Sequence, residues 1–206
     1  MVDRLHGRPA PPTDTTVRSG DWDSRDLADE EHTRVLFIDI DMTEARSEGA
    51  VFSECTFRGV RFNVSTHTSS AFLNCTFVRC AFFDSTFTGC KFVGSLFDGC
   101  THDLMKADGG DWSFAGLPGA DLRRSSFRDV RLREADLTAA RCSGAVFRNV
   151  DLSGALLHKT DFTGCDLRGS ELSSLDPYTT ELRNAIIDPY QAIVIANSLG
   201  LVVRDA

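Results

Sequence analysis

Large apolar residues recur at every fifth position along most of the chain. In residues 71–100, AFLNCTFVRCAFFDSTFTGCKFVGSLFDGC, phenylalanine stands at positions 72, 77, 82, 87, 92 and 97. An amphipathic helix repeats about every 3.6 residues and a half-buried strand about every 2, so neither element accounts for this spacing. The register runs from Trp22 to Ile187 without an insertion, and of the 15 phenylalanines only Phe83 and Phe114 lie outside it. The pattern predicts a repeat architecture with a five-residue unit.

A second column, of small residues, lies two positions before each large one, as at Cys75, Cys90 and Ala120. One large and one small residue on the same face, two apart, describe a very short strand. The position before the small residue is often glycine, as at Gly94 and Gly154, and glycine permits a tight turn there. A short strand and a turn, repeated, give a coil with flat sides whose inward residues stack on those of neighbouring coils.

The units ADLRR, SFRDV, ADLTA, VDLSG and CDLRG resemble the A-(D/N)-L-x-x signature of the pentapeptide-repeat family. The resemblance implies an all-β fold, a right-handed quadrilateral β-helix with four units per coil, in which residues n and n+20 stack. We expect a disordered N-terminal tail over 1–19, the β-helix over 20–187, and a short C-terminal helix with a dimerisation segment over 188–206. The core residues that we single out are Phe52, Phe57, Phe72, Phe77, Phe82, Phe87, Phe92, Phe97, Leu122 and Phe127.

The large-residue column is interrupted at seven positions, which are His32, Ser47, His67, His102, Ala107, Cys142 and Pro177. An inward histidine is more often a hydrogen-bonded structural residue than a ligand. The three histidines are not a whole number of coils apart, so stacking does not bring them together on one side, and we expect no metal site. The segment THDLMKADGG, near 102–110, is expected to form an irregular coil and is a candidate contact surface.

The period stops after Ile187, where the sequence predicts a helix. Asp188 suits the N-cap, Pro189 the first helical position and Gly200 the C-terminal cap. A solenoid needs its open end covered, so part of this helix belongs to the core. The segment is more apolar than a cap needs, so we favour an end-to-end homodimer over a simple cap. The expected dimer interface consists of Tyr190, Ile193, Ile195, Ala196, Leu199, Leu201 and Val203.

The charge of the chain indicates which kinds of partner it can bind. The formal net charge is −8, which argues against direct binding to nucleic acid and leaves basic protein partners open. Residues 21–48 carry a net charge of −7 and residues 149–188 a net charge of −4. The second zone covers roughly 10 Å of the rod axis, about one net charge per 2.5 Å, against about one per 1.7 Å in B-DNA.

The sequence gives little support to a metal or redox protein, an enzyme, or a membrane or secreted protein. Six of the seven cysteines lie at positions divisible by five and none forms a C-x-x-C pair, so they are interpreted as small apolar filler. The chain shows no catalytic constellation, and we expect neither an enzyme nor a cofactor. No apolar run approaches the roughly 20 residues that span a bilayer, and the first residues lack the apolar centre of a signal peptide. We therefore expect a cytoplasmic protein without a membrane partner.

Three stretches, VFSECTFRGVRF, STHTSSAFLNCTF and DPYQAIVIANSLGL, carry a closer resemblance within the family. They resemble the fluoroquinolone-resistance members, the mycobacterial MfpA type first and the Qnr type less closely. The resemblance implies a dimeric rod that mimics duplex DNA, binds DNA gyrase, a type II topoisomerase, and relieves its poisoning by fluoroquinolones. The expected gyrase-facing carboxylates are Asp151, Asp161, Asp166, Glu171, Asp176 and Glu181.

Two alternatives stay open at the sequence level. One is a structural or scaffolding rod whose partner is not a topoisomerase, since a fold does not fix a function. The other is self-protection against a different gyrase poison made by the producing cell. The target would then be the same, so the sequence does not separate this alternative from fluoroquinolone resistance.

Overall fold

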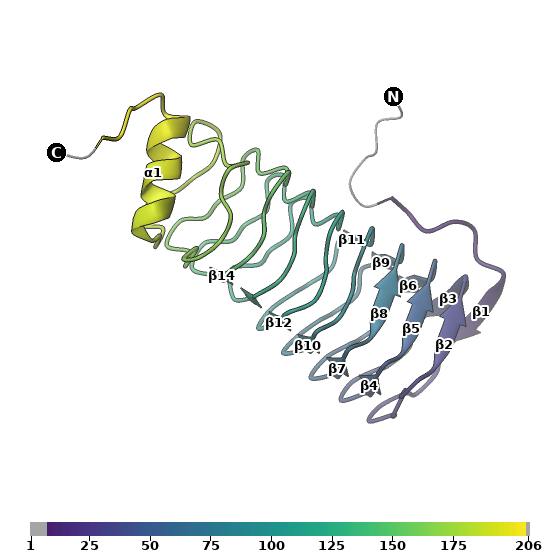
Figure 1. The fold of residues 1–206 in the computed structure, drawn as a ribbon. Helices are drawn as coiled ribbons and strands as arrows, with labels where there is room; N and C mark the ends of the chain where they lie inside the picture. The colour runs from purple at the N-terminus through teal and green to yellow at the C-terminus, as the bar shows by residue number, and fades with distance from the viewer. Residues whose placement is uncertain (1–7, 205–206) are drawn as a thin grey trace.

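The chain winds into a rod of stacked four-sided coils, closed at its C-terminal end by a helix (Figure 1). The computed structural model describes residues 8–204. We call the side that begins at Asp21 side A, and the three that follow it along the first coil sides B, C and D. Among the described residues, side A is held by isolated parallel bridges, such as the one between Asp41 and Arg61.

The other three sides carry short parallel strands, and each strand pairs with the equivalent strand of a neighbouring coil. Side B contains β4 (Arg46–Glu48), β7 (Thr66–Thr68), β10 (Thr86–Thr88), β12 (Lys106–Asp108), β13 (Ser126–Arg128) and β14 (Val146–Arg148). Side C contains β2 (Glu31–Thr33), β5 (Val51–Ser53) and β8 (Ala71–Leu73). Side D contains β1 (Thr15–Arg18), β3 (Val35–Ile38), β6 (Thr56–Arg58), β9 (Thr76–Val78) and β11 (Leu96–Asp98).

The register confirms the predicted right-handed quadrilateral β-helix. On side D, Phe37 pairs with Phe57, Phe57 with Phe77, and Phe77 with Phe97. The rings of Phe57 and Phe77 stack with centroids 4.9 Å apart and planes 5° apart. That separation matches the spacing of about 4.8 Å between neighbouring strands, so one ring fills one level of the rod.

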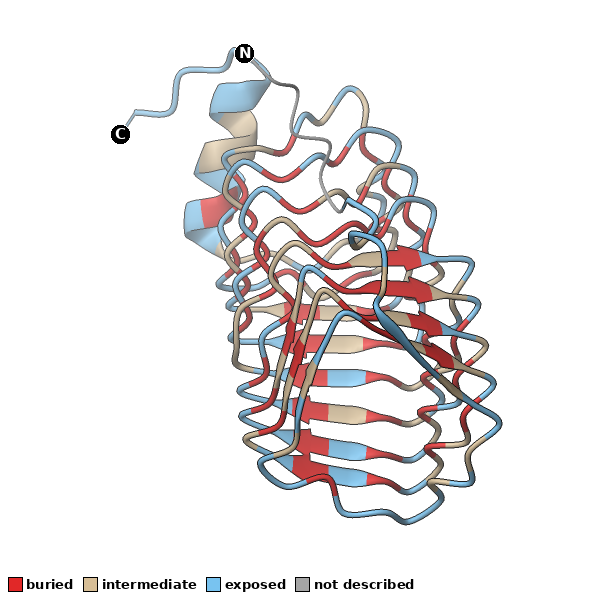
Figure 2. Cartoon of the chain, turned by 90° about the vertical axis from the view of Figure 1, so that its right-hand side faces the viewer, coloured by how far each residue is buried: buried red, intermediate tan, exposed pale blue. Residues whose placement is uncertain are grey.

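The predicted core residues all lie inside the rod, and none of the ten is more than 4% exposed. Figure 2 shows the buried positions recurring at the same places in successive coils. Burying each Phe or Leu side chain contributes roughly 1.5–3 kcal/mol before entropy costs. The stacked inward columns are therefore the main source of stability for the rod.

The corners of the coils require a left-handed backbone, which is why glycine recurs there. A Cβ atom added at Gly94 would overlap the Asn74 side-chain oxygen, so the Asn74 side chain would have to move to admit a larger residue. The same conformation also occurs at residues that rarely adopt it, including Val64 with φ 58° and Leu104 with φ 60°. A left-handed conformation costs a non-glycine residue roughly 1–2 kcal/mol, so these corners are strained.

The N-terminal end of the rod differs from the expected disordered tail over 1–19. Strand β1 lies inside that range and pairs with β3, with Val17 opposite Phe37. The Ala10 N–H donates to the Thr76 hydroxyl at 2.5 Å, so the segment before β1 runs back over side D. The β-helix therefore begins before residue 20. Residues 1–7 lie outside the described part of the chain.

Helix α1 (Pro189–Ser198) covers the last coil. Asp188 and Gln191 form a capping box, in which each side chain accepts from the other residue's backbone N–H, at 2.9 and 3.0 Å. The buried Gln191 amide also donates to the carbonyls of Leu167 and Ser170, both at 2.7 Å. The helix thus satisfies backbone acceptors that the end of the ladder would leave unpaired.

Candidate interaction surfaces

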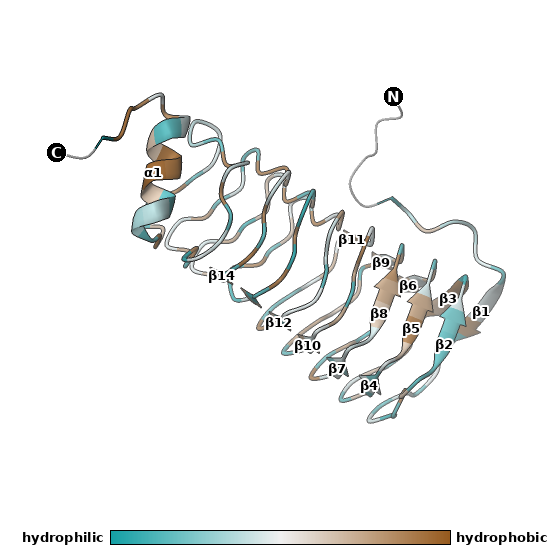
Figure 3. Ribbon diagram, viewed as in Figure 1, coloured by the Kyte–Doolittle hydropathy of each residue, from teal (hydrophilic) through white to brown (hydrophobic). Residues whose placement is uncertain are grey.

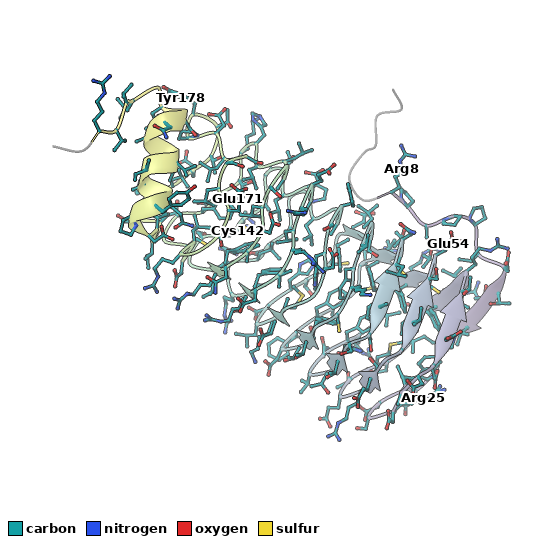
Figure 4. The ribbon with its side chains drawn as sticks, in the orientation of Figure 1. Arg8, Arg25, Glu54, Cys142, Glu171 and Tyr178 are labelled. Atoms are coloured by element: carbon teal, nitrogen blue, oxygen red, sulfur yellow. The ribbon has the colours of Figure 1, made fainter. Side chains whose placement is uncertain are left out.

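The six predicted carboxylates surround the C-terminal part of the rod rather than form one patch. Asp161 and Glu181 are bridge partners on side A, and Asp151 and Glu171 are bridge partners on the opposite side C. The other two extend the set to sides B and D, with Asp166 on side B and Asp176 at the start of a turn that follows Leu175. Glu171 is labelled near this end of the rod in Figure 4. The set is a belt of carboxylates around the rod axis.

Two members of the belt are paired with cations of the same chain. Asp151 accepts from Arg133 at 2.6 Å, and Asp166 accepts from Arg168 at 2.7 Å. The hydrogen bonds from Arg168 lower the pKa of Asp166. These two carboxylates are therefore less available to a partner than the sequence suggested.

The other four members make no ion pair within the described residues, and they are Asp161, Glu171, Asp176 and Glu181. The Thr163 hydroxyl and backbone N–H donate to Asp161 and lower its pKa, so this carboxylate stays charged at neutral pH. The free negative charge of the belt is thus concentrated on these four side chains.

The N-terminal coils form a second acidic surface. Asp41 is held by Arg61, whose hydrogen bonds lower the pKa of Asp41 to about 2, and Glu30 is held by Arg25. The guanidinium of Arg25 also covers the indole of Trp22 at 4.2 Å, at the end of the rod marked in Figure 4. Within residues 8–204, eight carboxylates of this zone make no ion pair, and they are Asp21, Asp23, Asp26, Asp29, Glu31, Asp39, Glu44 and Glu48. The sequence showed this charge but no reason to prefer it as a contact surface.

An apolar surface covers the C-terminal end of the rod. Tyr190 is 75% exposed and Leu201 is 59% exposed, and Figure 3 shows apolar residues in α1 and in the segment after it. Of the predicted interface, Tyr190, Ile193, Leu199, Leu201 and Val203 lie exposed. Ile195 instead packs against the core of the last coil, because it lies on the helix face toward the rod, and Ala196 is half-buried.

Three exposed apolar residues at this end were not singled out from the sequence, namely Tyr178, Ile186 and Val202. Tyr178 and Ile186 lie in units of the repeat but outside both inward columns, so the register itself was the signal that these apolar side chains face outward. Val202 continues the apolar run that begins at Leu201, and that run was the available signal.

The inward histidines behave differently from one another. His67 is buried and contacts the hydroxyls of Ser47 at 2.7 Å and Ser65 at 3.0 Å, as expected for a structural histidine. His32 contacts Glu30 at 2.9 Å. His102 is equally buried, but neither of its ring nitrogens has a hydrogen-bond partner. The expectation of a hydrogen-bonded histidine is wrong at this position, because its stacking neighbours are Phe82 and Leu122 rather than serines.

Sequence comparison places the repeat in a known family. Residues 113–141 and 135–173 match the family described as pentapeptide repeats, in eight copies. The stacking register extends the same unit to the coils before and after the match. Residues 113–173 thus carry pentapeptide repeats, and the coils on either side of them keep the same five-residue register. No curated protein matches the chain by sequence.

Solved structures share this fold. Two trypsin-treated forms of QnrB1, a plasmid-mediated fluoroquinolone-resistance protein, superpose with TM-scores of 0.54 and 0.52 at 24% identity. The first alignment covers 92% of this chain and 99% of that one, the second 93% and 98%. HetL, a pentapeptide-repeat protein involved in heterocyst differentiation regulation in the cyanobacterium Nostoc sp. strain PCC 7120, superposes with a TM-score of 0.54 at 16% identity, covering 83% and 84%. At these identities the likeness shows the fold alone.

Among the described residues, no helix is long and apolar enough to cross a bilayer.

Proposed function

We propose that this protein binds DNA gyrase as a rod-shaped mimic of duplex DNA and protects the enzyme from fluoroquinolones or related topoisomerase poisons. The observation that carries the proposal is the distribution of carboxylates on the rod. Both ends bear carboxylates that make no ion pair within the described residues, above all Asp161, Glu171, Asp176 and Glu181. Basic side chains of an enzyme that holds DNA phosphates would meet these carboxylates instead.

The end of the rod supplies the second element of the proposal. Apolar side chains of α1 and the following segment, including Tyr190, Ile193 and Leu201, are exposed at the end of a rod whose other large apolar residues are mostly buried. A homodimer formed end to end through this surface would place two carboxylate belts next to each other. A continuous acidic block would result, longer than one chain provides.

The test is supercoiling by purified gyrase across a titration of this protein, with and without ciprofloxacin. We expect inhibition of supercoiling, or less drug-induced cleavage, and we expect the effect to fade as salt rises because the contacts are screened. The variant Asp161→Lys/Glu181→Lys should lose the effect while keeping its circular dichroism spectrum. The matched control is Asp98→Lys/Asp108→Lys, which changes the charge equally at exposed mid-rod positions. Equal activity of both variants would refute the assigned surface.

The dimer has its own measurement. Ile193→Asp places a charge in the exposed apolar surface and should yield monomers in analytical ultracentrifugation. Asn197→Asp, on the same helix and also exposed, is the control and should stay dimeric. A dimer that survives Ile193→Asp would show that the end of the rod is only a cap.

A second candidate function is a scaffolding rod with a non-topoisomerase partner. The observation that favours it is the equal TM-score of HetL, whose described role is in heterocyst differentiation regulation. Absence of any effect on gyrase from the same host, at a large molar excess of the wild-type dimer, would favour this alternative.

A further inference from the structure

The backbone ladder of side A opens between two neighbouring coils. On the N-terminal side of the opening the ladder is made, since the Thr101 N–H donates to the Cys80 carbonyl at 3.0 Å. On the C-terminal side of the opening the ladder is intact again, since the Arg141 N–H donates to the Ala120 carbonyl of the preceding coil at 2.9 Å. Within the part of the chain that the structure describes, no backbone hydrogen bond joins residues 99–104 to residues 118–123.

Two hydrogen bonds close the opening at its ends. The Phe97 N–H donates to the Gly116 carbonyl at 2.9 Å, and the Ser126 N–H donates to the Met105 carbonyl at 2.9 Å. The two coils are therefore joined on both sides of a short gap. An extended peptide could not run through such a gap along the ladder, so an occupant must be small and must enter from the solvent.

A cleft of about 900 Å³ occupies the opening. Its wall includes His102, Cys100 and three arginines, Arg123, Arg124 and Arg141. The cleft adjoins the irregular region that the sequence indicated near 102–110, but no residue is inserted there. The coils separate instead, with the five-residue register intact.

His102 lines the cleft and carries two buried ring nitrogens that the chain leaves without hydrogen-bond partners. The side chain is 2% exposed, stacks on Phe82 with ring centroids 5.6 Å apart, and both ring nitrogens lack a partner. Burial lowers the pKa of His102 to about 4, so at neutral pH one nitrogen can donate and the other can accept. A buried polar group left unsatisfied destabilises the folded chain, and a bound molecule that pairs with it would remove that cost.

The charges at the cleft favour an anion. Asp121 accepts from Arg123 at 2.8 and 2.9 Å and from Arg141 at 2.8 Å. Asp103 accepts a single bond from Arg124 at 3.2 Å, and the Arg124 side chain is 63% exposed. Three guanidinium groups thus face two carboxylates, in a chain whose net charge is −8. Arg124 is the arginine with donors to spare.

We propose that this cleft binds a small planar carboxylate, with the carboxylate group on Arg124 and a neighbouring polar group of the ligand on His102. The guanidinium fork matches a carboxylate with two parallel hydrogen bonds. A flat aromatic ring can also stack on a guanidinium group of the cleft wall, such as that of Arg123 or Arg141. The proposal does not depend on gyrase binding, because its test follows a small molecule rather than the enzyme. The cleft adjoins the carboxylate belt on side A, where Arg141 of its wall is the bridge partner of Asp161.

The experiment uses salicylate, whose hydroxyl lies beside its carboxylate, as the probe, with benzoate and cyclohexanecarboxylate for comparison. The full chain, labelled with ¹⁵N-histidine, is titrated and the ring nitrogens of His102 are followed by NMR. We expect a saturable shift with salicylate, weaker binding of benzoate, which lacks the hydroxyl, and the weakest binding of the non-planar acid. No saturable His102 shift at millimolar salicylate would overturn the proposal.

Arginine variants separate a built site from diffuse attraction. Arg124→Gln should lower salicylate affinity at least tenfold. Arg58→Gln removes the same charge from an exposed position on side D and should leave affinity unchanged. An equal loss in both variants would overturn the proposal, because it would indicate attraction to net charge alone.

Cys100 provides an independent readout from the cleft wall. It is half-buried, whereas the other six cysteines are at most 2% exposed, so iodoacetamide should react with Cys100 first. Bound salicylate should slow this reaction in the wild type and in Arg58→Gln but not in Arg124→Gln. His102→Phe should fold and should lose the preference for salicylate over benzoate. Unchanged alkylation at saturating salicylate would contradict binding in the cleft.

Discussion

The two halves of the rod fill the same cross-section with different side chains. From Phe37 to Phe97 the inward columns are mostly aromatic, and rings one coil apart stack at 4.7–5.0 Å in pairs such as Phe72–Phe92 and Phe62–Phe82. From Leu117 onward the columns are mostly leucine, with Phe127, Phe147 and Phe162 as the aromatic members. Flat rings match the coil spacing, whereas branched leucines must interdigitate with small residues on the neighbouring coils.

The backbone pairing also differs between the two halves. Among the described residues, all the strands from β2 to β11 lie between Glu31 and Asp98, whereas only β13 and β14 lie beyond Leu117, where most contacts between coils are single bridges. The aromatic half thus pairs in longer runs than the aliphatic half. Both halves keep the same register from coil to coil, so one repeat geometry accommodates either type of core.

The cleft lies at the junction of the two halves. In that coil Ala107 is a small residue in a large-residue column, and the bulky Trp112 tilts by 34° over Phe92 at 4.1 Å. A Cβ at Gly110 would overlap the Cys90 carbonyl oxygen, so the backbone approaches unusually closely there. We infer that the mismatch between the two types of core is concentrated in one coil and opens side A.

The largest expected effect comes from truncating the two kinds of core residue on the same side. Phe77→Ala should cost about 3–5 kcal/mol, because the ring touches rings in its own coil and in both neighbouring coils. Leu137→Ala should cost about 2–4 kcal/mol, because smaller residues surround it. Urea unfolding followed by circular dichroism measures the losses, and hydrogen exchange assigns each to its half. A smaller loss for Phe77→Ala than for Leu137→Ala would contradict the view that ring stacking sets the stability of the first half.

An intermediate effect should distinguish the two buried histidines. Burial lowers the pKa of His67 to about 3 and that of His102 to about 4, both below the unfolded value near 6.5. Because the unfolded chain binds these protons more tightly, stability is full above pH 6.5 and falls as pH decreases, by about 2 kcal/mol per histidine between pH 7 and pH 5.

Phenylalanine variants test this expectation, because at neutral pH they should change the stability in opposite directions. His102→Phe removes two unsatisfied nitrogens and should raise stability by about 1–3 kcal/mol, whereas His67→Phe deprives Ser47 and Ser65 of a partner and should lower it by about 1 kcal/mol. Each variant should make stability less dependent on pH. Urea unfolding at pH 7 and pH 5 measures both quantities, and a shift of equal sign in the two variants would show that hydrogen bonding does not separate the sites.

The smallest expected effect concerns the corners. Val64, in the aromatic half, and Ala139, in the aliphatic half, both have a left-handed backbone, with φ of 58° and 56°. Val64→Gly should raise stability by up to about 1 kcal/mol because a β-branched residue is the more strained there, and Ala139→Gly should raise it less. Thermal unfolding of the two variants measures the difference. A larger gain for Ala139→Gly would mean that the Val64 side chain is not the source of strain.

Most of the fold could be predicted from the sequence because the repeat is local and strict. The column that contains Phe77 fixes both the inward face and the stacking partner, once four units per coil are assumed. Strand β1 was missed, although Val17 keeps the register, because no glycine precedes the small-residue column there and the Pro- and Thr-rich start was interpreted as a disordered tail. The unpartnered state of His102 could have been found by comparing its n−20 and n+20 neighbours with those of His67.

The opening of side A could not be predicted, because it depends on how bulk is distributed within a whole coil. Ala107 and Trp112 lie on different sides, and only their combined fit with the coils on either side determines where the ladder separates. Likewise, the sequence located the acidic belt but not the ion pairs of Asp151 and Asp166, which depend on side-chain directions.

Because the register is unbroken, the length of the rod changes in steps of one coil, whereas the direction in which its sides face changes in steps of one repeat unit. Adding or removing a whole coil would change the length by one level and leave every side facing as before, since each residue would meet an equivalent neighbour. Adding or removing a single unit of the repeat would turn everything beyond that point by a quarter of a revolution relative to the N-terminal coils. The angular phase between the acidic N-terminal coils and helix α1 is therefore set in four discrete steps, by a number of units rather than by any single contact.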